Sequence, residues 1–119
     1  MIQIVKDSDT RPGFFLQTAH TTYGIRVMET GHLEHLYYGE RITVDSQDPA
    51  SCAPLVIQRA FAPGNTCTYD REHPQISMED VCLEVGTLGK GDIREPFLEV
   101  RFADGSVTTD FTFDSYEVI

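Results

Sequence analysis

The sequence predicts an all-β fold, an antiparallel β-sandwich, and three observations lead to this prediction. Short apolar stretches alternate with polar residues at a period of two, which is typical of half-buried strands. Turn signals separate these stretches at short spacing. Helix-start signals are scarce: the one capping box begins at Ser77, and Gly86 leaves little room for a helix behind it.

The first third of the chain predicts four strands. Residues 2–5 form an apolar opening strand, and a turn around 11–13 leads to the apolar residues 14–17. Residues 22–27 alternate so that Tyr23, Ile25 and Val27 are expected on one buried face. A Thr-Gly turn at 30–31 then leads to an apolar stretch that closes at Gly39. Such a meander needs a second layer to cover its apolar face.

The middle of the chain breaks this pattern. Asp48-Pro49 is a turn signal in a polar segment, and residues 54–61 fit either a short helix or an irregular apolar stretch. Residues 62–74 carry two prolines and a Gly-Asn pair, which predicts a long exposed loop. Long loops inside compact domains are often functional.

Strand patterns resume in the last third. Val81, Leu83 and Val85 share one face, a glycine-rich turn follows, and residues 98–102 and 107–113 flank an Asp-Gly hairpin signal at 104–105. The final residues read as another strand. We therefore expect either a piece of a longer chain or a last strand that pairs elsewhere.

Composition restricts the class of function. A chain of 119 residues provides one domain, and 9 Lys and Arg against 19 Asp and Glu give a net charge of −10. This charge repels phosphate groups and anionic lipid, so we expect no nucleic-acid and no membrane partner. The N-terminus has no signal-peptide pattern. Three widely spaced cysteines, Cys52, Cys67 and Cys82, favour free thiols in a cytoplasmic protein.

Several segments together resemble one known family. They are residues 14–16, 22–23, 31–39 (Gly-His-Leu-Glu-His-Leu-Tyr-Tyr-Gly), 59–63 (Arg-Ala-Phe-Ala-Pro), 91–96 (Gly-Asp-Ile-Arg-Glu-Pro) and 104–111 (Asp-Gly-Ser-Val-Thr-Thr-Asp-Phe). Each segment is short, but their order and spacing cover nearly the whole chain. In this arrangement the chain resembles the N-terminal domain of the α-galactosidases of glycoside hydrolase family 36.

The resemblance implies both a fold and a role. It implies residues 1–119 are the N-terminal portion of a β-supersandwich that precedes a (β/α)₈ barrel holding both catalytic carboxylates. By resemblance this chain would have no catalytic residue, no metal and no cofactor. It would serve structure, homo-oligomer contacts and a substrate rim in a retaining enzyme that hydrolyses terminal α-galactosides, such as melibiose or raffinose.

The resemblance also implies a set of substrate contacts. In tetrameric members this domain reaches a neighbouring subunit's active site through an acidic residue and an arginine. The acidic position corresponds here to Gln58, beside Arg59, and the arginine corresponds best to Arg71. Gln58 can hydrogen-bond a sugar hydroxyl, but without charge assistance this bond should be weaker.

Residue chemistry offers other candidates, and structural roles explain each of them better. Carboxylate neighbours suited to glycoside cleavage are Asp92 with Glu95, Glu34 with Glu40, and Asp80 with Glu84, yet acidic side chains usually face solvent. Asp92 and Arg94 predict a loop-anchoring ion pair.

For the aromatic and histidine side chains, packing and surface roles compete with ligand binding. His32 and His35 are expected on opposite faces as surface or rim residues, which does not suit one shared metal. One of Tyr37 and Tyr38 should pack in the core, and the other stays open as a sugar-stacking residue.

Two alternative functions stay open. The chain could be a stand-alone carbohydrate-binding module, or a protein-interaction β-sandwich, since a fold does not fix a function. In either case an unfinished sheet has open edges, which predicts self-association by strand pairing.

Overall fold

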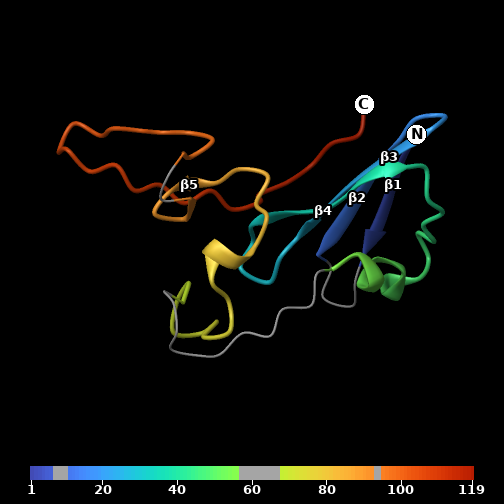
Figure 1. Cartoon of the computed structure of the whole chain (residues 1–119), viewed down its shortest axis with the longest axis horizontal. Helices are drawn as coiled ribbons and strands as arrows, with labels where there is room; N and C mark the ends of the chain where they lie inside the picture. Colours follow the sequence, from blue (N-terminus) through green and yellow to red (C-terminus); the bar gives the residue numbers. More distant parts are fainter. Residues whose placement is uncertain (7–10, 57–67, 93–94) are drawn as a thin grey trace.

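Four strands form the main sheet of the molecule. The computed structural model describes residues 1–6, 11–56, 68–92 and 95–119. One antiparallel sheet has the strand order β1-β2-β3-β4, with β1 (Ile2–Lys6), β2 (Pro12–Gln17), β3 (Thr21–Val27) and β4 (Leu33–Glu40) (Figure 1). Every strand follows its neighbour along the chain, so the predicted meander, with its opening strand, is confirmed.

The turn between β3 and β4 explains why the chain reverses at that point. The amide of Gly31 donates to the Met28 carbonyl at 2.9 Å, and the amide of Met28 donates to the His32 carbonyl at 2.8 Å. Gly31 has a φ of 84°, a left-handed conformation that glycine adopts without steric cost. A three-residue loop ending in such a residue is a common hairpin connection.

The core lies on one face of this sheet. Phe15, Val5 and Val44 are buried there, with Phe15 fully inaccessible to solvent. A short 3₁₀ helix, η1 (Pro49–Leu55), contacts β1 and adds Leu55 to the same cluster. The core is small, and it joins the meander to the segment that directly follows it.

The start of η1 corrects the prediction of a turn at Asp48-Pro49. Asp48 is the N-cap of η1, and its carboxylate accepts a hydrogen bond from the Ala50 amide at 2.9 Å. Pro49 occupies the first helical position, where its missing N–H removes no helical hydrogen bond. A polar residue followed by proline therefore begins a helix here.

The buried face of β3 differs from the predicted one at Tyr23 and Ile25, whereas Val27 is buried as predicted. Thr22 and Gly24 are the deeply buried positions, while Tyr23 and Ile25 are half-buried on the opposite face. Thr22 can be buried because its hydroxyl accepts a hydrogen bond from the Ile42 amide at 3.1 Å. Gly24 is buried because Phe15 of β2 packs over it.

The predicted strand at 81–85 is reduced to a single bridge. The amide of His35 donates to the Cys82 carbonyl at 2.7 Å, and the amide of Glu84 donates to the Leu33 carbonyl at 2.9 Å. This pairing places Leu83 opposite Glu34 at the free edge of β4. Beside it lie the 3₁₀ helix η2 (Met78–Asp80) and a small parallel pair, β5 (Thr87–Leu88) and β6 (Gly91–Asp92).

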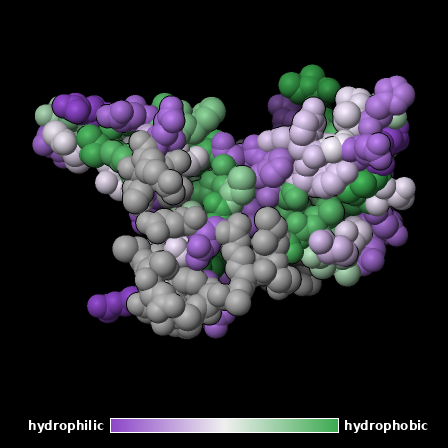
Figure 2. All heavy atoms as spheres, in the orientation of Figure 1, coloured by the Kyte–Doolittle hydropathy of each residue, from purple (hydrophilic) through white to green (hydrophobic). Residues whose placement is uncertain are grey.

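The predicted strands at 98–102 and 107–113 do not form, although the turn between them does. Gly105 has a φ of 86°, and the amide of Phe102 donates to the Ser106 carbonyl at 2.9 Å. The two arms run away from the sheet and back again (Figure 1), and Figure 2 shows hydrophobic residues at their surface among polar ones. Within the described chain no neighbouring strand completes a ladder along these arms, which explains the missing strands.

The end of the chain returns to the second face of the sheet. The amide of Phe113 donates to the Gly31 carbonyl at 2.7 Å. The rings of Phe113 and Tyr116 lie 6.0 and 5.0 Å from that of Phe14, which points away from the Phe15 core. This contact gives the sheet cover on both faces. The predicted class, all-β and antiparallel, is confirmed.

Among the helices of the described residues, none has the length and apolar character needed to cross a membrane.

Candidate functional site

Of the three residues predicted to contact substrate, the structure describes Arg71 alone. Gln58 and Arg59 lie outside the described residues. The first part of the predicted loop, residues 62–67, also lies outside them. Arg71 is exposed in an irregular segment, as expected for a loop residue. The site is therefore built around residues 69–76, called here the Arg71 loop.

One hydrogen bond joins the two ends of the Arg71 loop, and further bonds stabilise the turn at its tip. The amide of Tyr69 donates to the Ile76 carbonyl at 2.7 Å, which closes the base. At the tip, the Asp70 carboxylate accepts hydrogen bonds from the amides of Glu72 and His73 at 2.9 and 2.7 Å. The His73 ring lies 2.8 Å from the same oxygen through Nδ1. Aspartate bonded to the amides that follow it stabilises a tight turn, and Arg71 lies inside this one.

Tyr69 is held by a segment far away in the sequence. Its hydroxyl donates to the Asp110 carboxylate at 2.8 Å, and Nε2 of His32 lies 2.6 Å from the other oxygen of that carboxylate. The Tyr69 and His32 rings meet edge to face with centroids 5.0 Å apart. The ammonium group of Lys90 lies 4.6 Å from the Tyr69 ring centroid, a cation–π contact.

His32 is the centre of this arrangement, and the prediction that it is a surface or rim residue is wrong. Only 3% of its surface is exposed. Its Nδ1 lies 2.8 Å from the Thr30 hydroxyl, so both ring nitrogens have partners. The residue lies in the β3–β4 turn, before β4 begins, which is why strand alternation does not describe it. Tyr69, His32 and Asp110 are called here the Tyr69 anchor.

Hydrogen bonding shifts two pKa values in the Tyr69 anchor. The hydrogen bond to Asp110, followed by burial, raises the pKa of Tyr69 to about 12. Burial acts to raise the pKa of Asp110, but the hydrogen bonds from His32 and Tyr69 outweigh it and lower that pKa. Tyr69 therefore stays a neutral donor and Asp110 a charged acceptor at neutral pH.

A second tyrosine–carboxylate contact lies along β4. The Tyr23 hydroxyl donates to the Glu84 carboxylate, whose other oxygen lies 3.0 Å from Nδ1 of His35. Burial, followed by this hydrogen bond, raises the pKa of Tyr23 to about 12. The contact fastens the 82–84 bridge to the sheet, so these three side chains have a clear structural role.

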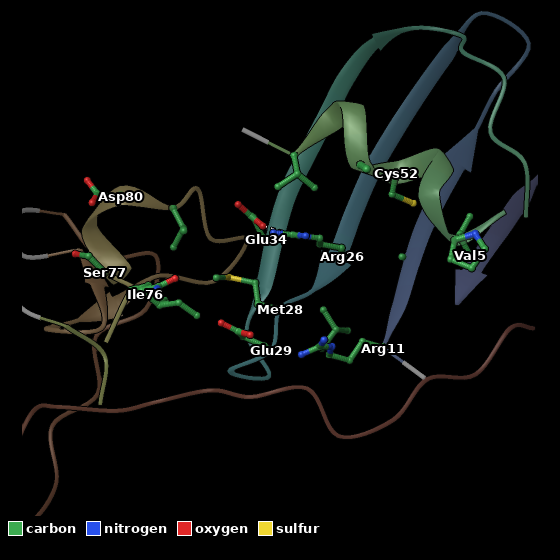
Figure 3. A pocket seen from close by; sticks show the side chains of 17 residues that line it. Val5, Arg11, Arg26, Met28, Glu29, Glu34, Cys52, Ile76, Ser77 and Asp80 are labelled. Carbon is green, nitrogen blue, oxygen red and sulfur yellow. Dashed lines mark hydrogen bonds and ion pairs between the residues drawn. The ribbon is translucent and has the colours of Figure 1, made fainter. Parts of the chain in front are cut away.

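A cavity of about 500 Å³ separates the sheet from the segment that contains η2. Figure 3 shows η1, Arg26 and Glu34 on one side and Ile76, Ser77 and Asp80 on the other. Arg26 Nε donates to the Glu34 carboxylate at 2.6 Å, and the Glu34 side chain is 6% exposed. This ion pair neutralises the charge that β3 and β4 bring to the cavity wall.

The structure does not bring the predicted carboxylate neighbours together as catalytic pairs among the residues it describes. In the first pair, Glu34 is bound to Arg26 and Glu40 is exposed. In the second pair, Glu84 is bound to Tyr23 and His35, and Asp80 lines the cavity. The side chain of Asp92 and all of Arg94 lie outside the described residues. No three His, Cys, Asp or Glu side chains in the described parts are grouped to hold a metal ion.

The paired tyrosines of β4 differ in exposure. The Tyr37 hydroxyl donates to the Glu40 carbonyl at 2.9 Å, and this ring is half-buried over Gly39. Tyr38 is 70% exposed. Tyr38 is therefore the one whose ring stays open to a ligand.

Sequence reasoning missed the Tyr69 anchor. Tyr69 lies 41 residues from Asp110, and Asp110 lies 78 residues from His32. No spacing rule connects residues so far apart. The available signal was Asp110 itself, an acidic residue within the Thr-Thr-Asp-Phe segment that carries part of the resemblance.

Comparisons with known proteins agree on one family. A family model described as the glycosyl hydrolase family 36 N-terminal domain matches residues 31–119. The bifunctional alpha-galactosidase/sucrose kinase AgaSK of Mediterraneibacter gnavus is 34% identical over 106 residues, which are 88% of this chain and 11% of that protein. Alpha-galactosidase AgaA of Geobacillus stearothermophilus is 28% identical over 105 residues, 88% of this chain and 13% of that protein.

Solved structures give the same result. The crystal structure of the alpha-galactosidase from Lactobacillus brevis matches with a TM-score of 0.75 and 33% identity, over 95% of this chain and 14% of that one. The galactosidase domain of AgaSK matches with a TM-score of 0.71 and 28% identity, over 96% of this chain and 15% of that one. This chain thus spans between 11% and 15% of the length of these relatives.

Proposed function

Because the chain belongs to glycosyl hydrolase family 36, as its N-terminal domain, we propose that it serves an α-galactosidase as a non-catalytic β domain. The observation that carries this proposal is the likeness of 95% of the chain to the alpha-galactosidase from Lactobacillus brevis, at 33% identity. The matched part is 14% of that chain, so the rest of such an enzyme is available to hold the chemistry.

The engagement of the acidic side chains supports a non-catalytic role. Retaining glycosidases hold two carboxyl groups about 5–5.5 Å apart, one as nucleophile and one as acid/base. Here Glu34, Glu84 and Asp110 are each bound to a cation, a tyrosine or a histidine that holds the fold together.

The same proposal includes a substrate rim. Arg71 is exposed on a loop whose turn is well tied, which suits a guanidinium that hydrogen-bonds sugar hydroxyls. Gln58 and Arg59 would belong to the same rim. The substrates would be terminal α-galactosides, including melibiose and raffinose, with galactose as the group recognised.

Homo-oligomer contacts and a cytoplasmic setting complete the proposal. Apolar side chains exposed along the C-terminal arms, such as Phe97 and Phe111, support an interface with further β structure or a second copy. Cys82, an exposed free thiol, is compatible with a reducing compartment.

The test is an activity assay on the purified chain with a chromogenic α-galactoside, beside the sequence of the gene beyond Ile119. We expect no hydrolysis by the chain alone and a barrel with two catalytic carboxylates encoded downstream. Hydrolysis by the 119-residue chain would overturn the non-catalytic role, and a gene that ends without a barrel would overturn the α-galactosidase assignment.

The exposed ring of Tyr38 favours a second candidate function, direct binding of sugar by this chain. An aromatic face in solvent can stack on the apolar CH surface of galactose. Calorimetric titration with raffinose tests it. Heat that disappears in Tyr38→Ala and persists in Tyr37→Ala would support a carbohydrate-binding module, while no heat with the parent chain would exclude it.

A further inference from the structure

The Arg71 loop is anchored by one of its own side chains to the rest of the fold. Tyr69 lies two residues before Arg71 and is the first residue of the loop. Three groups from three separate segments meet this one ring: the Asp110 carboxylate, the His32 ring and the Lys90 ammonium. A loop residue that merely faced solvent would not need three distant partners.

The anchor is continuous with the sheet. His32 is 3% exposed, and its second ring nitrogen contacts Thr30 in the β3–β4 turn. Asp110 lies three residues before Phe113 in the sequence, and the amide of Phe113 donates to the Gly31 carbonyl of the same turn. Tyr69 is thus connected to the β3–β4 hairpin through both Asp110 and His32.

The turn around Arg71 also binds the carboxylate of the preceding residue, Asp70. The Asp70 carboxylate accepts bonds from the Glu72 and His73 amides and contacts the His73 ring. With these three partners, the charge of Asp70 is directed into the turn. The Arg71 backbone is fixed between Tyr69 on one side and His73 on the other.

We propose that Tyr69, supported by Asp110 and His32, is a positioning residue that holds the Arg71 guanidinium in place for the galactoside. This inference rests on the proposed rim function of Arg71 and adds the device that orients it. A guanidinium on a fixed backbone loses less conformational entropy when it binds than one on a free loop. The anchor should therefore act on substrate affinity and leave the chemical step unchanged.

The first test measures loop order in the chain itself. Trypsin cleaves after arginine, and cleavage after Arg71 requires the loop to open. Tyr69→Phe keeps the ring contacts and removes the hydroxyl bond to Asp110, and Asp110→Ala removes the acceptor. We expect Tyr69→Phe to be cut after Arg71 about three- to tenfold faster than the parent, the size expected for the net loss of one solvent-exposed hydrogen bond. Asp110→Ala, which also removes the partner of His32, should be cut at least as fast as Tyr69→Phe.

Tyr23→Phe is the matched control for this test. It removes the other tyrosine–carboxylate hydrogen bond, that to Glu84, which lies at the 82–84 bridge. If the Tyr69 anchor acts locally, Tyr23→Phe leaves the rate of cleavage after Arg71 unchanged. Equal acceleration by Tyr23→Phe and Tyr69→Phe would mean general loosening of the fold and would overturn the proposal.

The second test measures kinetics in the α-galactosidase that carries this domain. Tyr69→Phe and Asp110→Ala should raise KM for melibiose about three- to tenfold with kcat unchanged, since a contact made equally in the ground and transition states acts on KM alone. Asp110→Asn, which keeps an oxygen acceptor for Tyr69, should restore part of the loss. In an Arg71→Ala background, Tyr69→Phe should have no further effect on KM.

Each outcome separates this inference from the proposed function. If Arg71→Ala leaves KM unchanged, the rim function fails, and the positioning role fails with it. If Arg71→Ala raises KM while Tyr69→Phe does not, the rim function stands and the positioning role is overturned. A KM effect of Tyr69→Phe that persists in the Arg71→Ala background would also overturn it.

Discussion

The ring of Phe15 occupies the space where a side chain at Gly24 would lie. The two residues face each other across β2 and β3 in register, and a methyl group at Gly24 would come within 2.8 Å of the ring. Phe15 is the largest fully buried side chain, so this contact sits at the centre of the core. A missing side chain on one strand thus makes room for a large one on the next.

Gly24→Ala is therefore expected to destabilise the fold by about 1–3 kcal/mol, because overpacking a close-packed core forces side chains from their rotamers. The free energy of unfolding, measured by urea titration, checks this. Gly13→Ala is the control: its added methyl group would meet its nearest neighbours, Cys52 and Phe15, at an ordinary 3.5 Å. Equal stability of Gly24→Ala and the parent would contradict the packing argument.

Because the carboxylate of Glu34 is buried, we expect its replacement to cost more stability than replacement of Glu40 on the same strand. Glu34→Ala should cost about 2 kcal/mol of unfolding free energy, because a hydrogen bond to a charged group is lost and Arg26 is left without its carboxylate. Glu40, exposed on the same strand, provides the comparison. Glu40→Ala should change stability by less than about 0.5 kcal/mol. Similar losses in thermal unfolding of both variants would show that the ion pair adds nothing.

Tyrosine titration gives a direct test of the two tyrosine–carboxylate contacts. Tyr23 and Tyr69 should ionise at a pKa of about 12, above the ordinary value of 10.0, and near-ultraviolet absorbance of tyrosinate reports this. Glu84→Gln should lower the pKa of Tyr23 alone, and Asp110→Asn that of Tyr69 alone. A pKa of Tyr23 that stays at about 12 in Glu84→Gln would mean that burial alone accounts for it.

Because the pKa values of Tyr23 and Tyr69 are raised in the folded state, the stability of the fold should depend on pH. A group whose pKa is higher in the folded state stabilises the fold fully below its unfolded pKa. Both contacts should therefore stabilise the fold below pH 10.0 and be lost as pH rises from 10.0 to about 12. Tyr23→Phe and Tyr69→Phe should each flatten this loss in urea unfolding measured across that range.

The exposed arms predict concentration-dependent association of the isolated chain. Phe97, Phe102 and Phe111 are 76%, 47% and 48% exposed beside extended backbone that no ladder completes in the described chain. Such edges recruit further strands. Sedimentation velocity should show oligomers at high concentration, and Phe111→Lys should reduce them without a change in the melting temperature. A monomer at every concentration would refute the prediction.

Most of the strands predicted in the first half of the chain follow from short-range sequence patterns. The strands around Phe14, Ile25 and Leu36 were found because alternation and turn residues act over a few positions, and the turn at Gly31 was found because its backbone angle requires glycine. The burial of Thr22 and Gly24 in place of Tyr23 and Ile25 could not be predicted from this pattern. Thr22 is buried because a distant amide, that of Ile42, satisfies its hydroxyl.

The strands predicted around Leu98 and Phe111 do not form, for a different reason. Their alternation is real, and the turn at Gly105 between them forms, but strand pairing needs a partner at the right distance. Sequence alternation records the faces a strand would have. It carries no information on whether a neighbouring strand is present in the chain at hand.

By itself the sequence determined the antiparallel β class, the meander and the family, because these depend on short-range periodicity and on the order of short segments. Only the tertiary structure decided that His32 is buried, that Asp110 meets Tyr69, and that Arg71 stands on a loop held by both. Contacts between residues 41 and 78 positions apart arise from chain packing, which no local spacing encodes.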